Sequence, residues 1–488
     1  MTDPARPLAE GFATPAREPW LAAVRASLKG APIEGLTHHT AEDLAIAPLY
    51  GPLAQSTRAA PQGRSMPGAA WDVRAHVAHP DPVQASARIL DALAGGSSSI
   101  LLTVDPSART GCAIASAEDL GRTLDGVVLE AATVALDAGF LGAVAAGWLA
   151  GAAKGSPAAK LAFHLDPLGA FAKAGASPGP IQAHIDHAAR TAAALAPVHP
   201  QASLFLASGR AVHEAGGSAA QELGVIAASA LAYARALTAA GLDMPRAFAA
   251  VALGVPVDGE HLRSIAKLRA ARDIWARITA ACGVQPPARI EARSSRRMLT
   301  AIDPWTNLIR LTAAGFAGGA GGADALVLAP FTDALGDPTP LAERLARNTQ
   351  LILIEESHLG AVGDPAAGSW FIEDLTSELA RAGWDMFRAI EAQGGMARAL
   401  ESGFIAANVE GVRMARAEAL ADGAAPVLGV SVFTDPDQAP VELDRVDRAA
   451  FARPAPDTRL PGPDSHCPAL TPVRTAETAE QVALDLEA

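Results

Sequence analysis

The 488-residue sequence has few cysteines, few aromatic residues and no excess of basic ones. Its cysteines Cys112, Cys282 and Cys467 stand alone, without a CxxC pair or the even set of a disulfide framework. Isolated cysteines argue against a disulfide scaffold and a structural zinc site, and they are typical of a protein of the reducing cytoplasm. The net charge of −13 repels phosphate backbones and acidic lipids, because binding to them needs clustered Lys and Arg. We therefore expect neither a nucleic acid nor a membrane among the partners.

Long hydrophobic runs are also absent. The longest uncharged apolar stretch, residues 138–153, is mostly Ala and Gly and is shorter than the roughly 20 residues of a spanning helix. It predicts a buried helix. Asp3 and Glu10 lie where a signal peptide would have a basic start and an apolar run, so we expect no export signal and a cytoplasmic protein.

From residue 71 onward, short apolar runs alternate with longer helical patterns, which is typical of βα units. Eight runs are predicted as strands: 71–77, 98–104, 126–131, 160–166, 203–208, 248–254, 288–293 and 325–330. The clearest predicted helices between them are 81–93, 214–239, 260–282 and 303–317. Eight evenly spaced units favour an α/β fold of the (β/α)8 TIM-barrel type over a doubly wound sheet. Active sites of such barrels lie on the loops after the strands.

The rest of the chain frames this barrel. Residues 1–70 predict an N-terminal arm with one amphipathic segment at 20–29, and the barrel is assigned to 71–345. Residues 346–433 predict a C-terminal helical extension, in which 341–358 is helical and 372–421 forms two helices separated at Gly394-Gly395. A strand-like run at 427–433 precedes a Pro-rich tail, 434–488, that ends in a short helical pattern.

Polar residues follow several predicted strands. His164 and Asp166 follow the fourth strand, His213 follows the fifth and Arg297 the seventh. Imidazoles and carboxylates at one barrel mouth could form an acid/base or metal site, and the arginine could bind an anionic substrate. With 12 His and 52 acidic residues in the chain, such groups also fall on solvated loops by chance, which we consider the stronger interpretation.

Three segments carry a resemblance to a known family: ARNTQLILIEES (346–357), DPAAGSWFIEDLT (364–376) and EAQGGMARALESG (391–403). They resemble the most distinctive stretch of the methylmalonyl-CoA mutase family, and the similarity extends from about Leu36 to about Phe433. The resemblance implies a barrel wrapped by an N-terminal arm. It also implies interconversion of methylmalonyl-CoA and succinyl-CoA through adenosylcobalamin, with CoA along the barrel axis and cobalamin on a separate C-terminal domain. Because only 55 Pro-rich residues follow Phe433, we expect this domain to be absent and no cofactor to be bound by this chain.

The sequence departs from the family where substrate would be bound. Arg210 and Ala211 occupy the position of the Tyr-His pair that follows Ser-Gly in active members, and an alanine side chain cannot donate a hydrogen bond. The tyrosine that active members carry near the second strand is missing from the stretch 108–114. Aliphatic residues at 100–102 and 204–206 replace small hydroxyl residues, so we expect a filled barrel axis.

These departures favour one hypothesis and leave two others open. The favoured one is the non-catalytic small subunit of a heterodimeric mutase, inactive by itself, whose large partner binds adenosylcobalamin and performs the isomerisation. The alternatives are a cobalamin-independent enzyme that uses His164, Asp166, His213 and Arg297, and an acyl-CoA-binding protein, although a filled axis makes acyl-CoA binding doubtful.

Overall fold

The computed structural model describes residues 11, 16–51, 63–64, 70–435 and 437–487, which fall into two compact units, Met1–Pro52 and Leu53–Ala488. The first unit contains α1 (Arg17–Ser27), the 3-10 turn η1 (Ile33–Leu36) and an antiparallel pair of short strands, β1 (His38–His39) and β2 (Ala45–Ile46). Helix α1 covers the amphipathic segment predicted at 20–29. Residues 1–10, 12–15, 52–62 and 65–69 of the predicted arm, with Asp3 and Glu10, lie outside the described residues.

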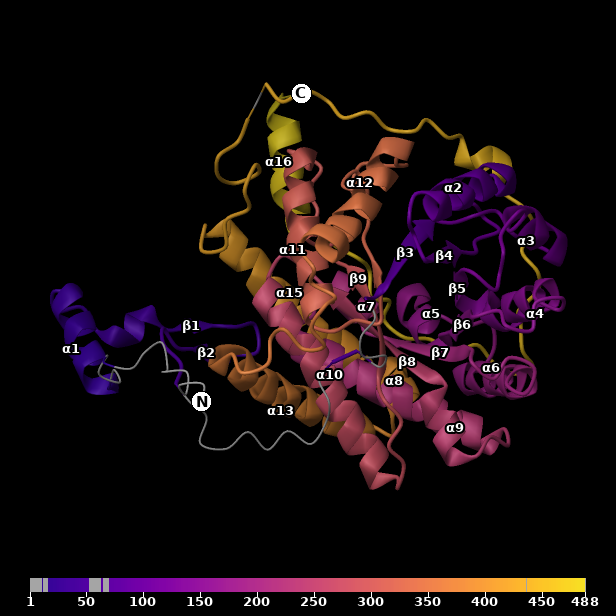
Figure 1. Cartoon of the computed structure of the whole chain (residues 1–488), viewed down its shortest axis with the longest axis horizontal. Helices are drawn as coiled ribbons and strands as arrows, with labels where there is room; N and C mark the ends of the chain where they lie inside the picture. The colour runs from indigo at the N-terminus through magenta and orange to yellow at the C-terminus, as the bar shows by residue number, and fades with distance from the viewer. Residues whose placement is uncertain (1–10, 12–15, 52–62, 65–69, 436, 488) are drawn as a thin grey trace, which may run out of the picture. The chain divides into compact units, whose positions relative to one another are not determined.

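The second unit is a closed barrel of eight parallel strands in the order β10-β3-β4-β5-β6-β7-β8-β9, surrounded by helices (Figure 1). The strands are β3 (Asp72–Val77), β4 (Ser99–Thr103), β5 (Thr133–Asp137), β6 (Leu161–Leu165), β7 (Ser203–Ser208), β8 (Val251–Val257), β9 (Arg289–Ser294) and β10 (Ala325–Val327). The predicted TIM barrel is therefore confirmed.

Helices follow the strands around the barrel. They are α2 (Pro82–Ala94), α3 (Ala117–Thr123), α4 (Gly142–Ala152), α5 (Pro167–Ala174), α6 (Ile181–Leu195), α7 (Arg210–Glu214), α8 (Ala219–Ala239), α9 (Met244–Ala249), α10 (His261–Ala281) and α11 (Asn307–Ala320), with the short turns η2 (Gly139–Leu141) and η3 (Pro304–Thr306). The extension adds α12 (Pro340–Leu351), the π-turn η4 (Ile352–Glu356), α13 (Trp370–Ala392), α14 (Met396–Glu401) and α15 (Phe404–Ala421). Helix α13 packs against α8 and α10. Within the described residues, no helix combines the length and apolar character needed to cross a bilayer.

Three strand predictions are wrong: two strands lie at other residues than predicted, and one predicted strand is a turn. The third strand is Thr133–Asp137 and not 126–131, which forms hydrogen-bonded turns after Gly126. The sixth begins at Val251, because Asp243 caps the short helix α9 over part of the predicted run. The run 427–433 is a tight turn, in which the Val427 carbonyl accepts hydrogen bonds from the N–H groups of Val430 and Ser431. A closed barrel offers it no strand edge to join.

Two predicted helices are divided. The run 214–239 breaks at Gly216-Gly217, after which Ser218 opens α8 with a capping box. The run 372–421 forms three helices and not two, because Gly403, with a φ of 78°, separates α14 from α15.

Residues 444–476 of the Pro-rich tail, which we call the strap, run over the loops that follow the strands. After the short turn η5 (Arg448–Phe451) it runs to α16 (Glu477–Glu487), and in Figure 1 its yellow trace passes the α2 end of the barrel. The Arg448 guanidinium donates to the carbonyls of Ala78 and Ala108 and pairs with Asp337. Further backbone hydrogen bonds join the strap to the loops after β6, β7 and β9.

Candidate functional site

Described residues at the C-terminal mouth of the barrel line a small cavity, of about 30 Å³. Its lining comes from the neighbouring strands β9, β10, β3 and β4 with their loops, and from the start of α7: His76, Leu101, Arg210, Arg293, Ser294, Arg296, Val327, Ala329 and Asp333. Pockets for small organic ligands measure roughly 300–1,000 Å³. The space at the mouth is therefore that of about one water molecule and does not admit an acyl-CoA.

Beneath the mouth, the barrel interior holds a buried ion-pair network centred on Glu291. Glu291 accepts hydrogen bonds from Arg74 and, at 2.6 Å, from Arg293 Nε, while Arg293 Nη1 donates to Asp137 Oδ2 at 2.9 Å. Strand β9 makes this possible because residues two apart face the same side of a strand. Burial alone would raise the pKa of Glu291, but Arg293, His164 and Arg74 hold it well below its usual range.

Two histidines border the network. Burial, together with the neighbouring arginines, lowers the pKa of His76 and of His164 to about 4. His164 Nδ1 lies 3.6 Å from Glu291 Oε2, and His164 has a φ of 46°, a strained value for a residue with a side chain. His76 Nε2 lies 2.9 Å from Thr103 Oγ1. Both imidazoles are therefore neutral at pH 7.

A second layer of the interior is apolar. Leu101, Ala135, Ala162 and Val327 form one buried cluster. Phe205 of β7 faces outward, where it stacks on Tyr233 of α8. Side chains of both layers lie in the barrel interior. Leu101 lies there as the sequence predicts, whereas Phe205 faces outward and one layer is ionic rather than aliphatic.

The four candidate residues do not form one site. His164 lies in the ion-pair network, whereas Asp166 caps α5 by accepting from Gly169 N at 3.0 Å and from the Tyr233 hydroxyl at 2.5 Å. Burial raises the pKa of Asp166 to about 6. Only His213 and Arg297 lie together. Among the described residues, no three His, Cys, Asp or Glu side chains are placed to hold a metal ion.

His213 belongs to a buried hydrogen-bonded cluster in which both ring nitrogens are used. Its Nδ1 lies 2.7 Å from Glu222 Oε1, and its Nε2 lies 2.6 Å from Ser295 Oγ. Lys267 Nζ donates to the other oxygen of Glu222 at 2.5 Å. Burial would raise the pKa of Glu222, but Lys267 and His213 lower it to about 2. The cluster ties α7 to α8, α10 and the loop after β9.

Arg297 supports the same cluster from the loop after β9. Its guanidinium donates to the carbonyls of His213 at 2.8 Å and Gly217 at 2.9 Å, and lies 3.5 Å from Asp258. These contacts position the backbone between α7 and α8. His213 and Arg297 therefore have structural roles that account for their polar atoms.

Arg210 and Ala211 begin the short helix α7. The methyl group of Ala211 is buried, and Arg210 Nε lies 3.8 Å from Glu214 Oε1 while its side chain lines the mouth cavity. The guanidinium of Arg210 can donate hydrogen bonds at the mouth, whereas the side chain of Ala211 cannot.

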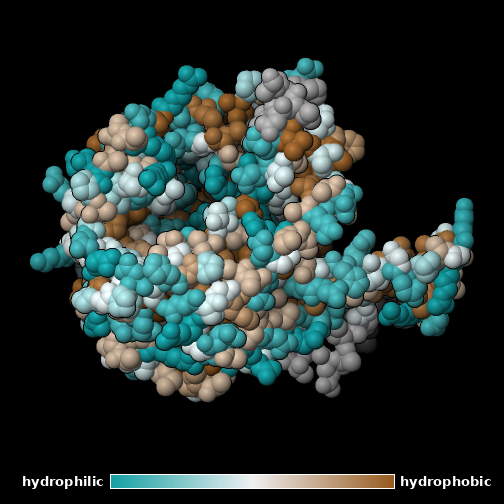
Figure 2. All heavy atoms as spheres, turned by 180° about the vertical axis from the view of Figure 1, so that it is seen from behind, coloured by the Kyte–Doolittle hydropathy of each residue, from teal (hydrophilic) through white to brown (hydrophobic). Residues whose placement is uncertain are grey.

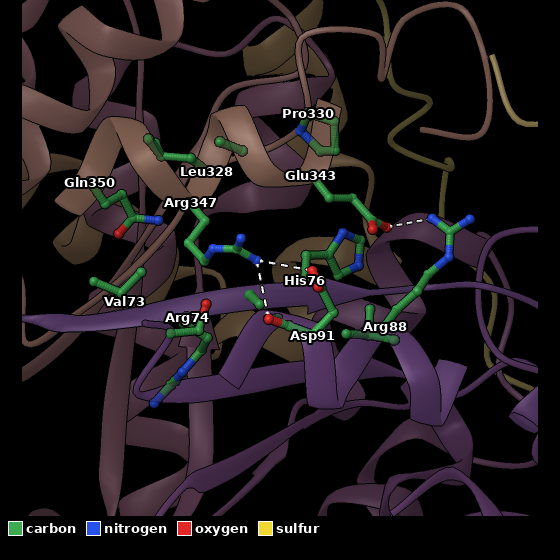
Figure 3. A pocket seen from close by; sticks show the side chains of 15 residues that line it. Val73, Arg74, His76, Arg88, Asp91, Leu328, Pro330, Glu343, Arg347 and Gln350 are labelled. Atoms are coloured by element: carbon green, nitrogen blue, oxygen red, sulfur yellow. Dashed lines mark hydrogen bonds and ion pairs between the residues drawn. The ribbon is translucent and has the colours of Figure 1, made fainter. Parts of the chain in front are cut away.

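A cavity of similar size lies outside the barrel, between β3, α2 and α12 (Figure 3). Arg88 pairs with Glu343 at 2.7 Å, and Arg347 contacts Asp91 at 3.4 Å. These pairs bridge α2 and α12. The cavity holds about 30 Å³, so its residues fasten the two helices together rather than bind a ligand.

Sequence reasoning missed Arg74, Glu291, Glu222 and Lys267. The first two carry a readable signal, because charged residues at alternate positions of an otherwise apolar strand point to one face. Arg74 and His76 alternate in β3, as Glu291 and Arg293 do in β9. Glu222 and Lys267 lie within helices, where a charged residue gives no such signal.

We expect stability to fall between pH 6.5 and pH 4 because of His76 and His164. Their pKa is about 4 in the folded chain but about 6.5 when unfolded, so the unfolded state binds more protons in this window. Urea unfolding at a series of pH values measures the effect. The variant His76→Gln should show a shallower decline than the parent. An equally steep decline would show that His76 does not contribute.

The fold and these interior clusters define the class: an α/β barrel protein of the (β/α)8 type, with an ionic and an apolar cluster inside the barrel and a cavity of about 30 Å³ at its mouth. A family model described as methylmalonyl-CoA mutase matches residues 93–457. The chain belongs to the methylmalonyl-CoA mutase family.

Relatives in this family are of two kinds. The chain is 38% identical to the methylmalonyl-CoA mutase small subunit of Streptomyces virginiae over 84% of its own length and 66% of the relative. It is 34% identical to that of Propionibacterium freudenreichii subsp. shermanii, over 82% and 64%. It is 27% identical to a methylmalonyl-CoA mutase of Cereibacter sphaeroides, over 88% and 66%. The chain thus spans about two thirds of the length of these relatives.

Proposed function

We propose that this chain is the non-catalytic small subunit of a heterodimeric, adenosylcobalamin-dependent mutase that isomerises methylmalonyl-CoA to succinyl-CoA. A large subunit of the same family performs the chemistry and holds the cofactor. The observation that carries the proposal is the filled axis, together with the alanine at position 211. A thioester chain cannot pass through the Glu291 network without breaking buried ion pairs, which is strongly destabilising.

The candidate histidines His164 and His213 do not fit the role of a cobalamin ligand at the barrel mouth. His213 uses both ring nitrogens in hydrogen bonds, and His164 lies inside the barrel beside Glu291. Neither can present a free nitrogen to a cofactor metal above the mouth. The same contacts weigh against a re-tasked enzyme that uses His164, Asp166, His213 and Arg297, since these groups lie in three separate places.

A structural subunit acts by binding. A partner that binds only the folded form shifts the folding equilibrium toward that form by mass action. The described surface carries large exposed apolar side chains on η3 and α11, namely Trp305, Ile309 and Phe316. Figure 2 shows brown patches among the polar side chains of one face. Exposed apolar groups of this kind are typical of interaction surfaces.

We propose that the complex works in the cytoplasm, which suits a chain with three unpaired cysteines.

Co-purification tests the proposal. The tagged chain is expressed alone and together with an untagged large subunit of the family, and turnover of methylmalonyl-CoA is measured with adenosylcobalamin present. We expect a one-to-one complex, turnover by that complex and none by the isolated chain. A control complex with a catalytically inactive large subunit should show no turnover. Turnover in the control, turnover by the isolated chain, or failure of the two chains to co-purify would overturn the proposal.

A further inference from the structure

A larger cavity, of about 250 Å³, lies between α15 and the region where the strap meets α16. Helix α15 contributes Arg413 and Arg416, the loop after β9 contributes Arg297, and the chain leading into α16 contributes Arg474, Thr475 and Thr478. Four arginines thus line one cavity of a chain whose net charge is −13. We call it the arginine cavity. It is separate from the barrel axis and the mouth.

Arg416 is the unusual member of this group. Its Nε is buried and has no hydrogen-bond partner among the described residues, although the side chain as a whole is only partly buried. Burial, and then the like charges of Arg297 and Arg263, lower the pKa of Arg416 to about 10. A buried N–H donor without a partner is costly, so native proteins usually provide such groups with an acceptor.

The neighbouring acidic groups are already committed. Glu410, which also lines the cavity, pairs with Arg413, its neighbour one helical turn away. Glu480 pairs with Arg474 and accepts a hydrogen bond from Ala301 N at 2.6 Å. Asp258 lies 3.5 Å from Arg297. Asp258 and Glu222 favour the charged form of Arg416, but Arg416 Nε has no hydrogen-bond partner among the described residues and can donate to a group from outside the chain.

The walls of the cavity are held in place by backbone contacts. Val473 N donates to Glu214 O and Thr475 N to Arg297 O, each at 2.8 Å. Gly216 adopts a φ of 102°, and a Cβ at this position would lie 3.0 Å from Arg413 Cβ, so the missing side chain lets α15 approach closely. A site with fixed walls needs little reorganisation when a ligand binds.

We propose that the arginine cavity binds a small phosphate-bearing anion, with Arg416 as its principal ligand. The planar guanidinium fork matches phosphate oxygens, and two threonine hydroxyls on the opposite wall can donate further hydrogen bonds. The volume suits inorganic phosphate or a small phosphate ester and is too small for an entire acyl-CoA. The bound anion would connect α15 to the strap.

Ligand-dependent unfolding tests this proposal without any measurement of mutase activity. Thermal unfolding of the purified chain is followed with inorganic phosphate, with glycerol phosphate, and with chloride at matched ionic strength. We expect a phosphate-specific rise in Tm of about 2–5 °C at saturation. A larger rise with glycerol phosphate than with inorganic phosphate would identify an ester as the ligand, and equal rises would identify the free anion.

Two variants assign the effect to Arg416. In Arg416→Gln we expect at least tenfold weaker phosphate binding by calorimetry. We also expect an unliganded Tm no lower than that of the parent, because the substitution removes a buried donor without a partner and the repulsion from Arg297 and Arg263. Arg388→Gln is the matched control, since Arg388 lies exposed on α13 beside Asp385, and it should bind phosphate as the parent does. Phosphate and chloride effects of equal size, or unchanged affinity in Arg416→Gln, would overturn the proposal.

Discussion

Replacing Glu291 by Gln is expected to lower the free energy of unfolding by about 3–5 kcal/mol, because it leaves buried arginines without their main counter-charge. Arg74 and Arg293 both donate to Glu291, and their side chains are only 6% and 11% exposed. Asp137 remains for Arg293, but Arg74 keeps a hydrogen bond to Ser99 Oγ at 3.0 Å and a 3.4 Å contact with the partly exposed Asp72. The loss should therefore come mainly from Arg74.

Urea unfolding at pH 7 measures this change. The matched control is Glu378→Gln, which breaks an exposed pair with Arg381 on α13 and should change stability by no more than about 0.5 kcal/mol. A change below about 1 kcal/mol in Glu291→Gln would show that water reaches the barrel interior. In that case the axis would not be filled, and the main argument for a non-catalytic role would fail.

Much of the barrel could be predicted from the sequence, because alternating apolar runs and helices identify βα units regardless of their details. The error at the third strand arises where two short apolar runs lie close together in the sequence. The stretch around Val127 and Val128 looks like a strand, yet Val128 is 64% exposed and the strand lies seven residues later. Apolar character alone does not distinguish a turn that covers Leu90 from a strand that pairs with β4.

The candidate site was harder to predict, because proximity to a strand end does not fix where a side chain points. Asp166 and His164 are two residues apart, but one caps α5 and the other lies beside Glu291, since His164 has a left-handed backbone conformation at the end of β6. The partners of His213 come from α8, α10 and β9, and only the folded structure brings these elements together. The substitution at position 211, by contrast, is readable from the sequence alone.

Replacing Lys267 by Met should also cost about 3–5 kcal/mol at pH 8, because Glu222 then stays buried without its ammonium partner. His213 can supply a counter-charge if it becomes protonated. In the parent chain, burial and then Arg297 lower the pKa of His213, and Lys267 adds to this effect. Without Lys267, the unpaired Glu222 favours the imidazolium, so the pKa of His213 rises in the folded variant.

A folded pKa raised above its parent value adds stability as pH falls through it. The deficit of Lys267→Met relative to the parent should therefore be smaller at pH 6 than at pH 8, as measured by urea unfolding at both pH values. Lys154→Met serves as control, because Lys154 is exposed after α4, and its effect should be small and independent of pH. A deficit of the same size at both pH values would show that His213 cannot take up the proton. The imidazole would then be held neutral by Ser295 and Arg297, and the cluster would depend on Lys267 alone for its positive charge.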